Sequence, residues 1–158
     1  MTQPQIITEE MHAMIGKETP PVTYEVDNTG CRQFARAVGY TDPIFYDAEE
    51  ARSRGYRGIV APYGFLGHPA GPPGGSARTS EILGLNNIPL KRILNGGTAI
   101  EYFDDVCSGD VLTATTRLAD LTQREGRMGP MVMVSLETSF RNQAEKLVAI
   151  QRGTMIRY

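Results

Sequence analysis

Hydrophobic and polar positions near the start of the chain follow two different periods. Val22–Val26 alternates apolar and polar residues, which is typical of a half-buried strand. The next apolar residues follow the i, i+3, i+4, i+7 spacing of one helix face: Cys31, Phe34, Ala35 and Val38. Asp27 or Asn28 can cap this helix and Gly39 can end it. The pattern predicts a strand followed by an amphipathic helix.

Two shorter helices are indicated by their end signals. Thr8 can cap a first helix that ends at Gly16. Asp47 can cap another, because Glu50 stands three residues on as in a capping box, and this helix should end near Gly55. Each signal is local, so both helices are expected whatever the rest of the chain does.

The middle of the chain lacks a regular period. Gly58–Pro62 is a short apolar run that a proline stops, and prolines and glycines recur as far as Pro89. No long helix can pass through Pro69–Gly75, since proline removes a helical hydrogen bond. We expect a long ordered loop or a lid there.

The last third of the chain is predicted to be all strand. Its strand-like segments are Thr98–Val106, Val111–Asp120, Met131–Phe140 and Leu147–Arg157. A loop is expected at Gln123–Pro130 and a turn at Arg141–Glu145. The fold class is therefore α+β, with helices against one face of an antiparallel meander, and residues 1–158 are expected to form a single domain.

Composition removes several classes of function. The 158 residues are 41% hydrophobic and 22% charged, and the formal net charge is −2, which disfavours nucleic acid or an anionic membrane as a partner. Arg52, Arg54 and Arg57 form a local cluster, either for a phosphate-bearing ligand or as a solvated helix end. No leader and no membrane-spanning stretch is recognisable, so we expect a reducing cytoplasm.

The chain has two cysteines, Cys31 and Cys107. Neither stands in a CxxC or CxxH context, so the sequence predicts no disulfide framework, no metal site and no other cofactor.

A family resemblance rests on an ordered set of short motifs. They are Gly39-Tyr40-Thr41-Asp42-Pro43-Ile44-Phe45-Tyr46-Asp47, Gly58–Pro62, Leu94–Thr98, Ser108–Leu112, Gly126–Gly129 and Phe140–Gln143. Together, from about Ile15 to Ile156, they resemble the MaoC-like hydratase and dehydratase superfamily. More narrowly, the chain is similar to its non-catalytic, N-terminal-type halves, the FAS1-like dehydratase domains and HadA-type subunits.

The resemblance implies a hot-dog fold, in which an antiparallel sheet wraps a central helix and two units pair into a continuous sheet. Here that helix is expected to be shortened or broken. The implied chemistry is reversible hydration of a trans-2-enoyl thioester on CoA or acyl carrier protein. Active halves carry a loop that reads Gly-Asp-x-Asn-Pro-hydrophobe-His, whose Asp and His hold the reacting water. A backbone N–H at the start of the central helix polarises the thioester carbonyl.

Alignment on Gly39 and Pro43 puts Tyr40 at the Asp position and Phe45 at the His position. A phenyl ring cannot move a proton, and an ordinary phenol with a pKa of ~10 is a poor base. We therefore expect no catalytic residue in this loop. If the chain does catalyse, the candidates are Asp42, Tyr46 and His68, against the simpler interpretations of a turn carboxylate and a loop histidine.

Substrate contacts are expected at two places. The first comprises the loop and the start of the central helix, with Tyr40, Phe45, Pro62, Tyr63 and Gly64. The second is Asn95, Gly96 and Gly97, where glycines either admit a close backbone or simply make a turn. The break at Pro69–Gly75 suggests room for a long or bulky acyl chain, or else a loop filled by its own side chains.

The leading hypothesis is a subunit of a heteromeric enoyl-CoA hydratase or 3-hydroxyacyl-thioester dehydratase in fatty acid, steroid or polyketide metabolism. A MaoC-like partner, in a hot-dog heterodimer or tetramer, would supply Asp and His. One alternative is a self-sufficient homodimeric hydro-lyase. Another is an acyl-thioester binding protein without catalysis. A hot-dog thioesterase is disfavoured, because 62–75 contains no Asp or Glu.

Overall fold

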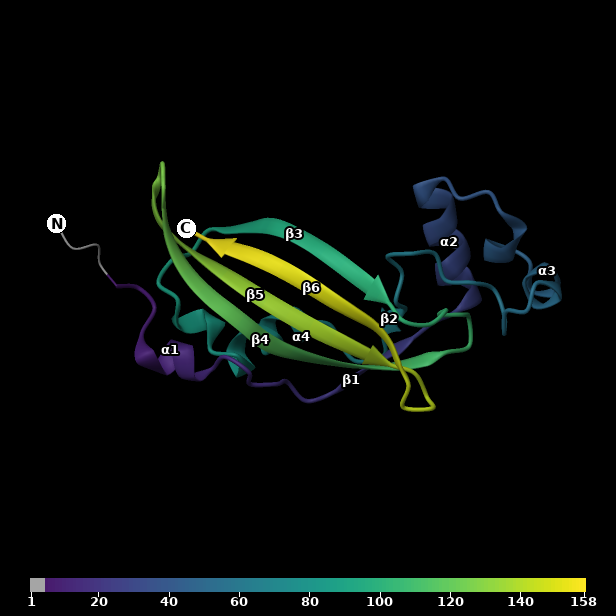
Figure 1. The fold of residues 1–158 in the computed structure, drawn as a ribbon, viewed down its shortest axis with the longest axis horizontal. Helices are drawn as coiled ribbons and strands as arrows, with labels where there is room; N and C mark the ends of the chain where they lie inside the picture. The colour runs from purple at the N-terminus through teal and green to yellow at the C-terminus, as the bar shows by residue number, and fades with distance from the viewer. Residues whose placement is uncertain (1–4) are drawn as a thin grey trace.

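A six-stranded antiparallel sheet forms the body of the protein in the computed structural model, which describes residues 5–158 (Figure 1). The strand order is β2-β1-β4-β5-β6-β3. The strands are β1 (Val22–Glu25), β2 (His68–Pro69), β3 (Ile93–Tyr102), β4 (Val111–Gly126), β5 (Gly129–Arg141) and β6 (Leu147–Arg157). The predicted α+β class, with an antiparallel sheet, is confirmed.

The helices are α1 (Glu9–Ala13), α2 (Asn28–Val38), α3 (Ala48–Ser53) and α4 (Gly75–Ile82), with 3-10 turns at Pro43–Phe45 and Leu85–Asn87. Three of the helices begin where their local capping signals predict, whereas α4 lies in the stretch that was expected to be a long loop or lid. The side chains of Thr8, Asp27 and Asp47 accept the expected capping bonds. The predicted α2 stripe is only partly right, because Val38 is 46% exposed. The C-terminal end of α2 projects beyond the sheet, so nothing covers this last residue (Figure 1).

The prediction of a loop at Gln123–Pro130 is wrong, because β4 and β5 extend into this segment. Gln123 pairs with Val132 and Gly126 pairs with Gly129, so only two residues form the turn. Gly129 has a φ of +110°, which the tight reversal requires and which other residues resist. The meander is also shorter than predicted, since β3 pairs with β6 at the far edge and not with β4.

The boundaries of β3 differ from the expected Thr98–Val106 by four to five residues. Asn95–Gly97 was expected to precede the strand and lies inside it. The pairing with β6 shifts register between Asn95 and Gly97, and the Asn95 side chain accepts a hydrogen bond from the Gly97 amide at 2.9 Å. A bulge of this kind disguises a strand, because it interrupts the two-residue alternation on which the prediction depended.

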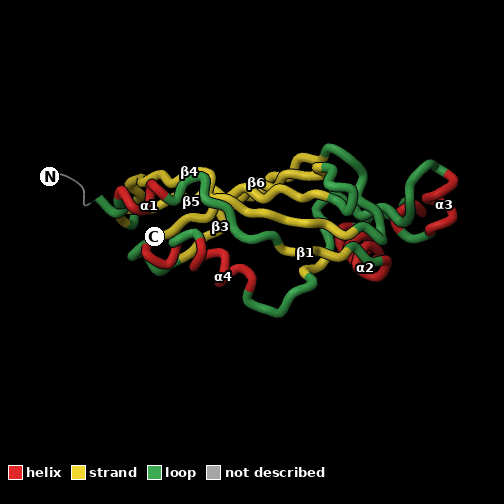
Figure 2. Tube along the Cα trace, turned by 90° about the horizontal axis from the view of Figure 1, so that it is seen from below, coloured by secondary structure: helices red, strands yellow, loops and turns green. Residues whose placement is uncertain are grey.

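The inner face of the sheet carries two separate apolar clusters. One packs α1 and the segment after α4 against β4 and β5, through residues such as Met11, Leu85 and Val134. The other packs α2 against the opposite end of the sheet, through residues such as Cys31, Phe65 and Phe140. The eight-residue α4 covers only the first cluster, so the expected short central helix is confirmed (Figure 2).

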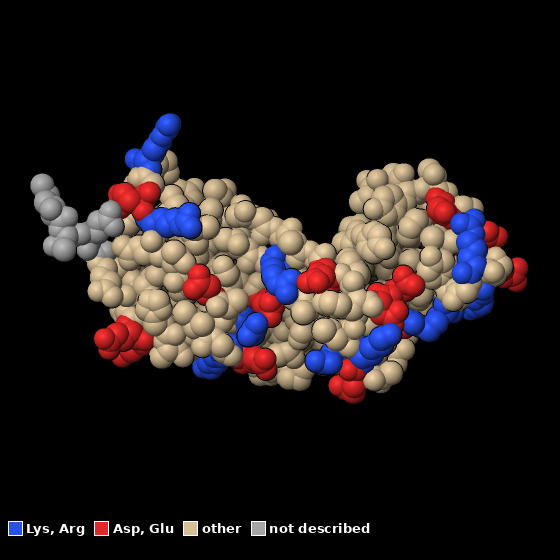
Figure 3. All heavy atoms as spheres, in the orientation of Figure 1, with Lys and Arg blue, Asp and Glu red and all other residues tan. Residues whose placement is uncertain are grey.

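The second cluster packs a lobe, which contains α2 and α3, against the end of the sheet. In the space-filling view the surface is hollowed between this lobe and the body of the sheet (Figure 3). Charged side chains of both signs are scattered over this face, without a large field of either sign (Figure 3). Among residues 5–158, no helix is long and apolar enough to cross a membrane.

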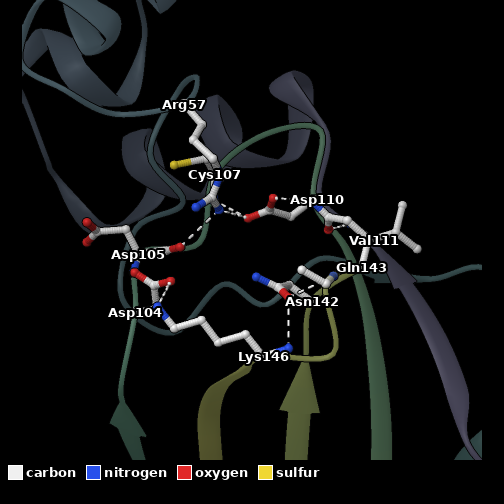
Figure 4. A network of polar contacts seen from close by, with 10 residues as sticks. Arg57, Asp104, Asp105, Cys107, Asp110, Val111, Asn142, Gln143 and Lys146 are labelled. Carbon is white, nitrogen blue, oxygen red and sulfur yellow. Dashed lines mark hydrogen bonds and ion pairs between the residues drawn. The ribbon is translucent and has the colours of Figure 1, made fainter.

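A polar knot around Asp110 attaches the lobe to the sheet (Figure 4). The Asp110 side chain is only 3% exposed, and its Oδ2 accepts hydrogen bonds from the Arg57 guanidinium at 2.6 Å and the Cys107 amide at 2.9 Å. Its Oδ1 accepts one from Gln143 at 3.2 Å. Three segments distant in sequence thus meet at one carboxylate, whose burial is tolerated because its oxygens are satisfied.

Replacing Arg57 by methionine should destabilise the fold. Arg57→Met keeps the length of the side chain but leaves the buried Asp110 carboxylate without its cation, at a cost of about 2 kcal/mol in the free energy of unfolding. Urea denaturation measures this loss. Arg54→Met is the matched control, because both Arg54 and its partners are largely exposed and the ion pairs contribute little. Equal stability of the two variants would contradict the role given to the knot.

Both cysteines should be inert in the folded protein. Burial raises the pKa of the Cys31 thiol to about 12 and also raises the pKa of Cys107, so neither forms thiolate at pH 8. Ellman's reagent should label neither in the native protein and both in guanidinium. The variant Met128→Cys should label at once, since Met128 is 72% exposed. Rapid labelling of the native chain would contradict this burial.

Candidate functional site

The loop Gly39–Asp47 takes its shape from a series of short-range contacts. Gly39 ends α2 in the left-handed region with a φ of 78°, and the Tyr40 amide donates back to the carbonyl of Ala35. The Asp42 side chain then caps the 3-10 turn by accepting from the Ile44 amide at 3.1 Å. Proline at the first position of that turn suits its fixed φ. Gly39, Asp42 and Pro43 thus shape the loop through contacts between residues that are close in sequence.

One further contact closes the loop on itself, and two hold it against α2 and the end of α3. The Tyr46 hydroxyl donates to the Tyr40 carbonyl, and the Arg32 guanidinium donates to the Tyr46 carbonyl at 3.0 Å. Arg54 pairs with Asp42 at 3.0 Å and also contacts Glu50. The polar groups of Asp42 and Tyr46, two of the candidate catalytic residues, are therefore already engaged within the loop.

Tyr40 and Phe45, the aromatic residues expected at the proton-transfer positions, lie against each other. The ring centroids of Tyr40 and Phe45 are 5.1 Å apart, a tilted contact typical of attractive aromatic pairs. Phe45 lines a hollow of about 150 Å³ with Tyr56, Tyr63 and Tyr102. Tyr40 and Phe45 also line an open hollow of about 410 Å³ with Tyr63. The two hollows, which share Phe45 and Tyr63, are here called the aromatic cleft.

The far wall of the aromatic cleft is built from the end of β3 and the turn after Pro62. The rings of Tyr63 and Tyr102 are 4.9 Å apart, and Tyr63 is 68% exposed. The Gly64 amide donates a hydrogen bond to the Tyr102 hydroxyl oxygen at 2.8 Å. Burial raises the pKa of Tyr102, so its hydroxyl is neutral throughout the physiological range. Pro62 is fully buried and supports the turn.

Two carboxylates stand at the floor of the smaller hollow, which Asp104 and Asp105 both line. Asp104 pairs with Lys146 at 2.8 Å, and this hydrogen bond holds the pKa of the Asp104 carboxyl below its usual range. Asp104 therefore stays charged at neutral pH. The aromatic cleft thus combines apolar rings, a neutral phenol and an anionic floor, an arrangement suited to apolar contact and not to proton transfer.

His68 lies away from the aromatic cleft. It lies in β2 beside the N-terminus of α2, where its Nε2 is 3.9 Å from Oδ2 of Asp27. The centroids of the His68 and Phe65 rings are 5.2 Å apart. The loop begins at the opposite end of the 11-residue α2, which spans about 16 Å. Asp42 and Tyr46 share the loop, but the fold does not bring His68 to them within one chain.

The expected contact region Asn95–Gly97 is also remote from the aromatic cleft. It lies seven residues before Tyr102 along β3, roughly 20 Å away. Asn95 lines an apolar hollow of about 290 Å³ with Leu136, Gly153 and Met155. Leu136 and Met155 also pack against the apolar cluster below α4. This second site, here called the edge hollow, therefore opens on the inner face of the sheet beside its free edge.

The arginine cluster divides in the structure. Arg54 is occupied by carboxylates and Arg57 by Asp110, and Arg52 shares with Arg57 a surface hollow that Asp27 also lines. Across residues 5–158, no three His, Cys, Asp or Glu side chains are grouped so as to hold a metal ion. The sequence reading did not assign Tyr102 to the site. Only the pairing of β3 with β6 brings it to Gly64, and no local signal marks that contact.

Several known proteins are similar to this chain in sequence. A "UPF0336 protein" from Streptomyces griseus is 34% identical over 107 residues, which cover 67% of this chain and 69% of that protein. A second, from Clavibacter michiganensis, is 34% identical over 119 residues, or 73% of each chain. The similarity spans most of both chains, so it is not confined to one motif.

Solved structures with the same fold include two complexes from Mycobacterium tuberculosis. The ChsH1-ChsH2 complex matches with a TM-score of 0.74 and 16% identity, over 96% of this chain and 97% of that one. The truncated HadBC complex, a 3R-hydroxyacyl-ACP dehydratase, matches with a TM-score of 0.69 and 23% identity, over 90% and 96%. The hot-dog fold implied by the motifs is confirmed.

A family model covers nearly the whole sheet and the lobe. The model for the FAS1-like dehydratase domain region matches residues 13–151, from α1 into β6. This range includes the loop, the aromatic cleft and the Asp110 knot. The chain belongs to the FAS1-like dehydratase domain family.

Proposed function

We propose that this chain is the non-catalytic half of a heteromeric enoyl-thioester hydratase or 3-hydroxyacyl-thioester dehydratase. The observation that carries the proposal is the Tyr40–Phe45 contact, because both proton-transfer positions hold aromatic rings that pack on each other at 5.1 Å. The two positions therefore lack the carboxylate and the imidazole that would hold the reacting water and transfer its proton. A second, MaoC-like chain supplies the carboxylate and the imidazole.

The free edge of the sheet supports the presence of a second chain. All residues of β3 from Ile93 to Ala99 are exposed, and Ile93 and Leu94 are 57% and 54% exposed although apolar. An open strand with apolar side chains is a site for strand addition or aggregation unless another chain covers it. The solved complexes with the same fold, HadBC and ChsH1-ChsH2, are each described as a complex. We assign the β3 edge to the catalytic partner.

The edge hollow supports an acyl-binding role. It lies beside the proposed interface, and its lining from Leu136, Gly153 and Met155 is almost wholly apolar. An apolar acyl chain gains free energy by leaving water, and each buried CH₂ contributes about 0.8 kcal/mol. We therefore propose that the chain forms one wall of a pocket for a long or bulky acyl group carried on CoA or acyl carrier protein.

The chain alone should not hydrate crotonyl-CoA or a longer enoyl-CoA, because it lacks the acid and the base. Addition of the MaoC-like partner chain should restore turnover, measured as loss of the enoyl-thioester absorbance. A partner whose loop Asp is replaced by Asn serves as the control and should stay inactive with this chain. Full activity of this chain by itself would contradict the proposal.

A charge on the β3 edge should prevent assembly. Leu94→Glu places a carboxylate where the partner's strand is expected, and burying an unpaired charge costs several kcal/mol. We expect at least a tenfold weaker affinity for the partner in sedimentation or titration calorimetry. Met128→Glu, at the exposed β4–β5 turn, is the control and should assemble normally. Normal assembly of Leu94→Glu would exclude this edge as the interface.

Filling the edge hollow should change chain-length preference. A Cβ at Gly153 meets only one atom, 4.0 Å away, so Gly153→Leu is accommodated and projects into the hollow. In the assembled enzyme, the ratio of kcat/KM for a long enoyl-CoA to that for crotonyl-CoA should fall about tenfold or more. Ser139→Leu adds the same side chain on the other face of β5 as a control. An unchanged ratio would contradict the proposal that the acyl chain binds in the edge hollow.

A further inference from the structure

The hydrogen bond between Gly64 and Tyr102 has a chemical meaning beyond packing. The Gly64 amide lies in a turn where the Phe65 amide donates to the Pro62 carbonyl, and it donates to the hydroxyl of Tyr102, a residue that lines the aromatic cleft. A backbone N–H directed into a cleft is the type of donor that polarises a carbonyl oxygen during acyl chemistry. In this chain the position 2.8 Å from that donor already holds the hydroxyl oxygen of Tyr102.

Tyr102 is held firmly in this position. It ends β3, paired with Ala149 of β6, and the Phe103 amide that follows donates to the Val148 carbonyl at 2.9 Å. Its ring packs on Tyr63 on one side and borders the apolar cluster of the lobe on the other. The paired end of β3 therefore holds the Tyr102 hydroxyl next to the Gly64 amide. Displacing the side chain would break both this hydrogen bond and the ring contact with Tyr63.

The space beside Tyr102 also disfavours a thioester. The hollow that Tyr102 itself lines holds about 150 Å³, less than the ~300–1,000 Å³ usual for small-molecule sites. The larger hollow of the cleft, about 410 Å³, is lined by Tyr40, Phe45 and Tyr63 but not by Tyr102. A substrate carbonyl directed at the Gly64 amide would thus find that donor occupied and little space beside it.

We propose that Tyr102 is an internal plug, which closes this chain's own half-site so that the assembled enzyme binds one acyl thioester per pair of chains. The proposal rests on the proposed function, since it concerns the half-site that pairs with the catalytic one. Tyr102 acts as a specificity-determining residue, because its hydroxyl occupies the place of a substrate oxygen. The two related clefts of the pair then differ in binding as well as in chemistry.

Binding stoichiometry in the assembled enzyme tests the plug. Butyryl-CoA, which is saturated and cannot be hydrated, is titrated by calorimetry. The wild-type pair should bind one molecule, and Tyr102→Ala should bind a second, more weakly. Tyr102→Phe removes only the hydroxyl that occupies the Gly64 amide, so it should also admit a second molecule, more weakly than Tyr102→Ala. Phe103→Ala, at the adjacent 49% exposed residue, should stay at one. Two molecules bound by the wild-type pair, or one by a folded Tyr102→Ala pair, would overturn the proposal.

The Gly64 amide resonance gives a test that does not depend on a large truncation or on the partner. In the ¹⁵N-labelled chain alone, butyryl-CoA should leave the wild-type Gly64 amide signal unmoved at concentrations that saturate the assembled enzyme. In Tyr102→Ala the same ligand should shift it. A shift in the wild type would show that Tyr102 does not exclude the carbonyl. Failure of the chain to assemble with any MaoC-like partner would instead refute the proposed function and leave this result standing.

Discussion

The arrangement of the molecule depends on the burial of one carboxylate. Asp110 has almost no contact with water, so each of its oxygens must find a donor inside the protein. The donors come from Arg57, Cys107 and Gln143, on three segments that lie far apart in sequence. With the end of 103–110 held there, the Ala61 amide meets the Val106 carbonyl at 2.8 Å. The turn with Gly64 is thereby set opposite the end of β3.

In the loop Gly39–Asp47, local hydrogen bonds set the backbone, and the aromatic side chains pack on one another. Gly39, Asp42 and Pro43 keep the loop closed by local hydrogen bonds that do not depend on the neighbouring side chains. Aromatic residues then replace water and charge with ring contacts between Tyr40 and Phe45. Such a site loses the strain and the desolvation cost of a buried acid–base pair.

Helices were predictable from the sequence because their signals are local. Thr8, Asp27 and Asp47 each accept bonds from amides only two or three residues away. The strands were predictable where two-residue alternation was regular, as in β6, whose bounds match the expectation Leu147–Arg157. The start of β3 was misplaced because the bulge at Asn95–Gly97 breaks that alternation.

The site was less predictable than the fold, because its decisive contacts are long-range. Gly64 and Tyr102 are 38 residues apart, and Arg57 and Asp110 are 53 apart. Neither pair is marked by spacing or composition, and only the tertiary arrangement brings each pair together. The motifs identified the family and the altered loop. They did not indicate that the Tyr102 hydroxyl accepts the hydrogen bond of the Gly64 amide.

The bulge in β3 has a consequence for the chain before it meets a partner. A regular, apolar edge strand would add copies of itself without limit, which is the route to fibrous aggregates. Asn95 and Gly97 interrupt the ladder of hydrogen-bonding groups, and Gly97 adopts a φ of +133° that another copy cannot match in register. The irregular edge thus protects newly made, unpaired chains, while a strand shaped to the bulge still docks.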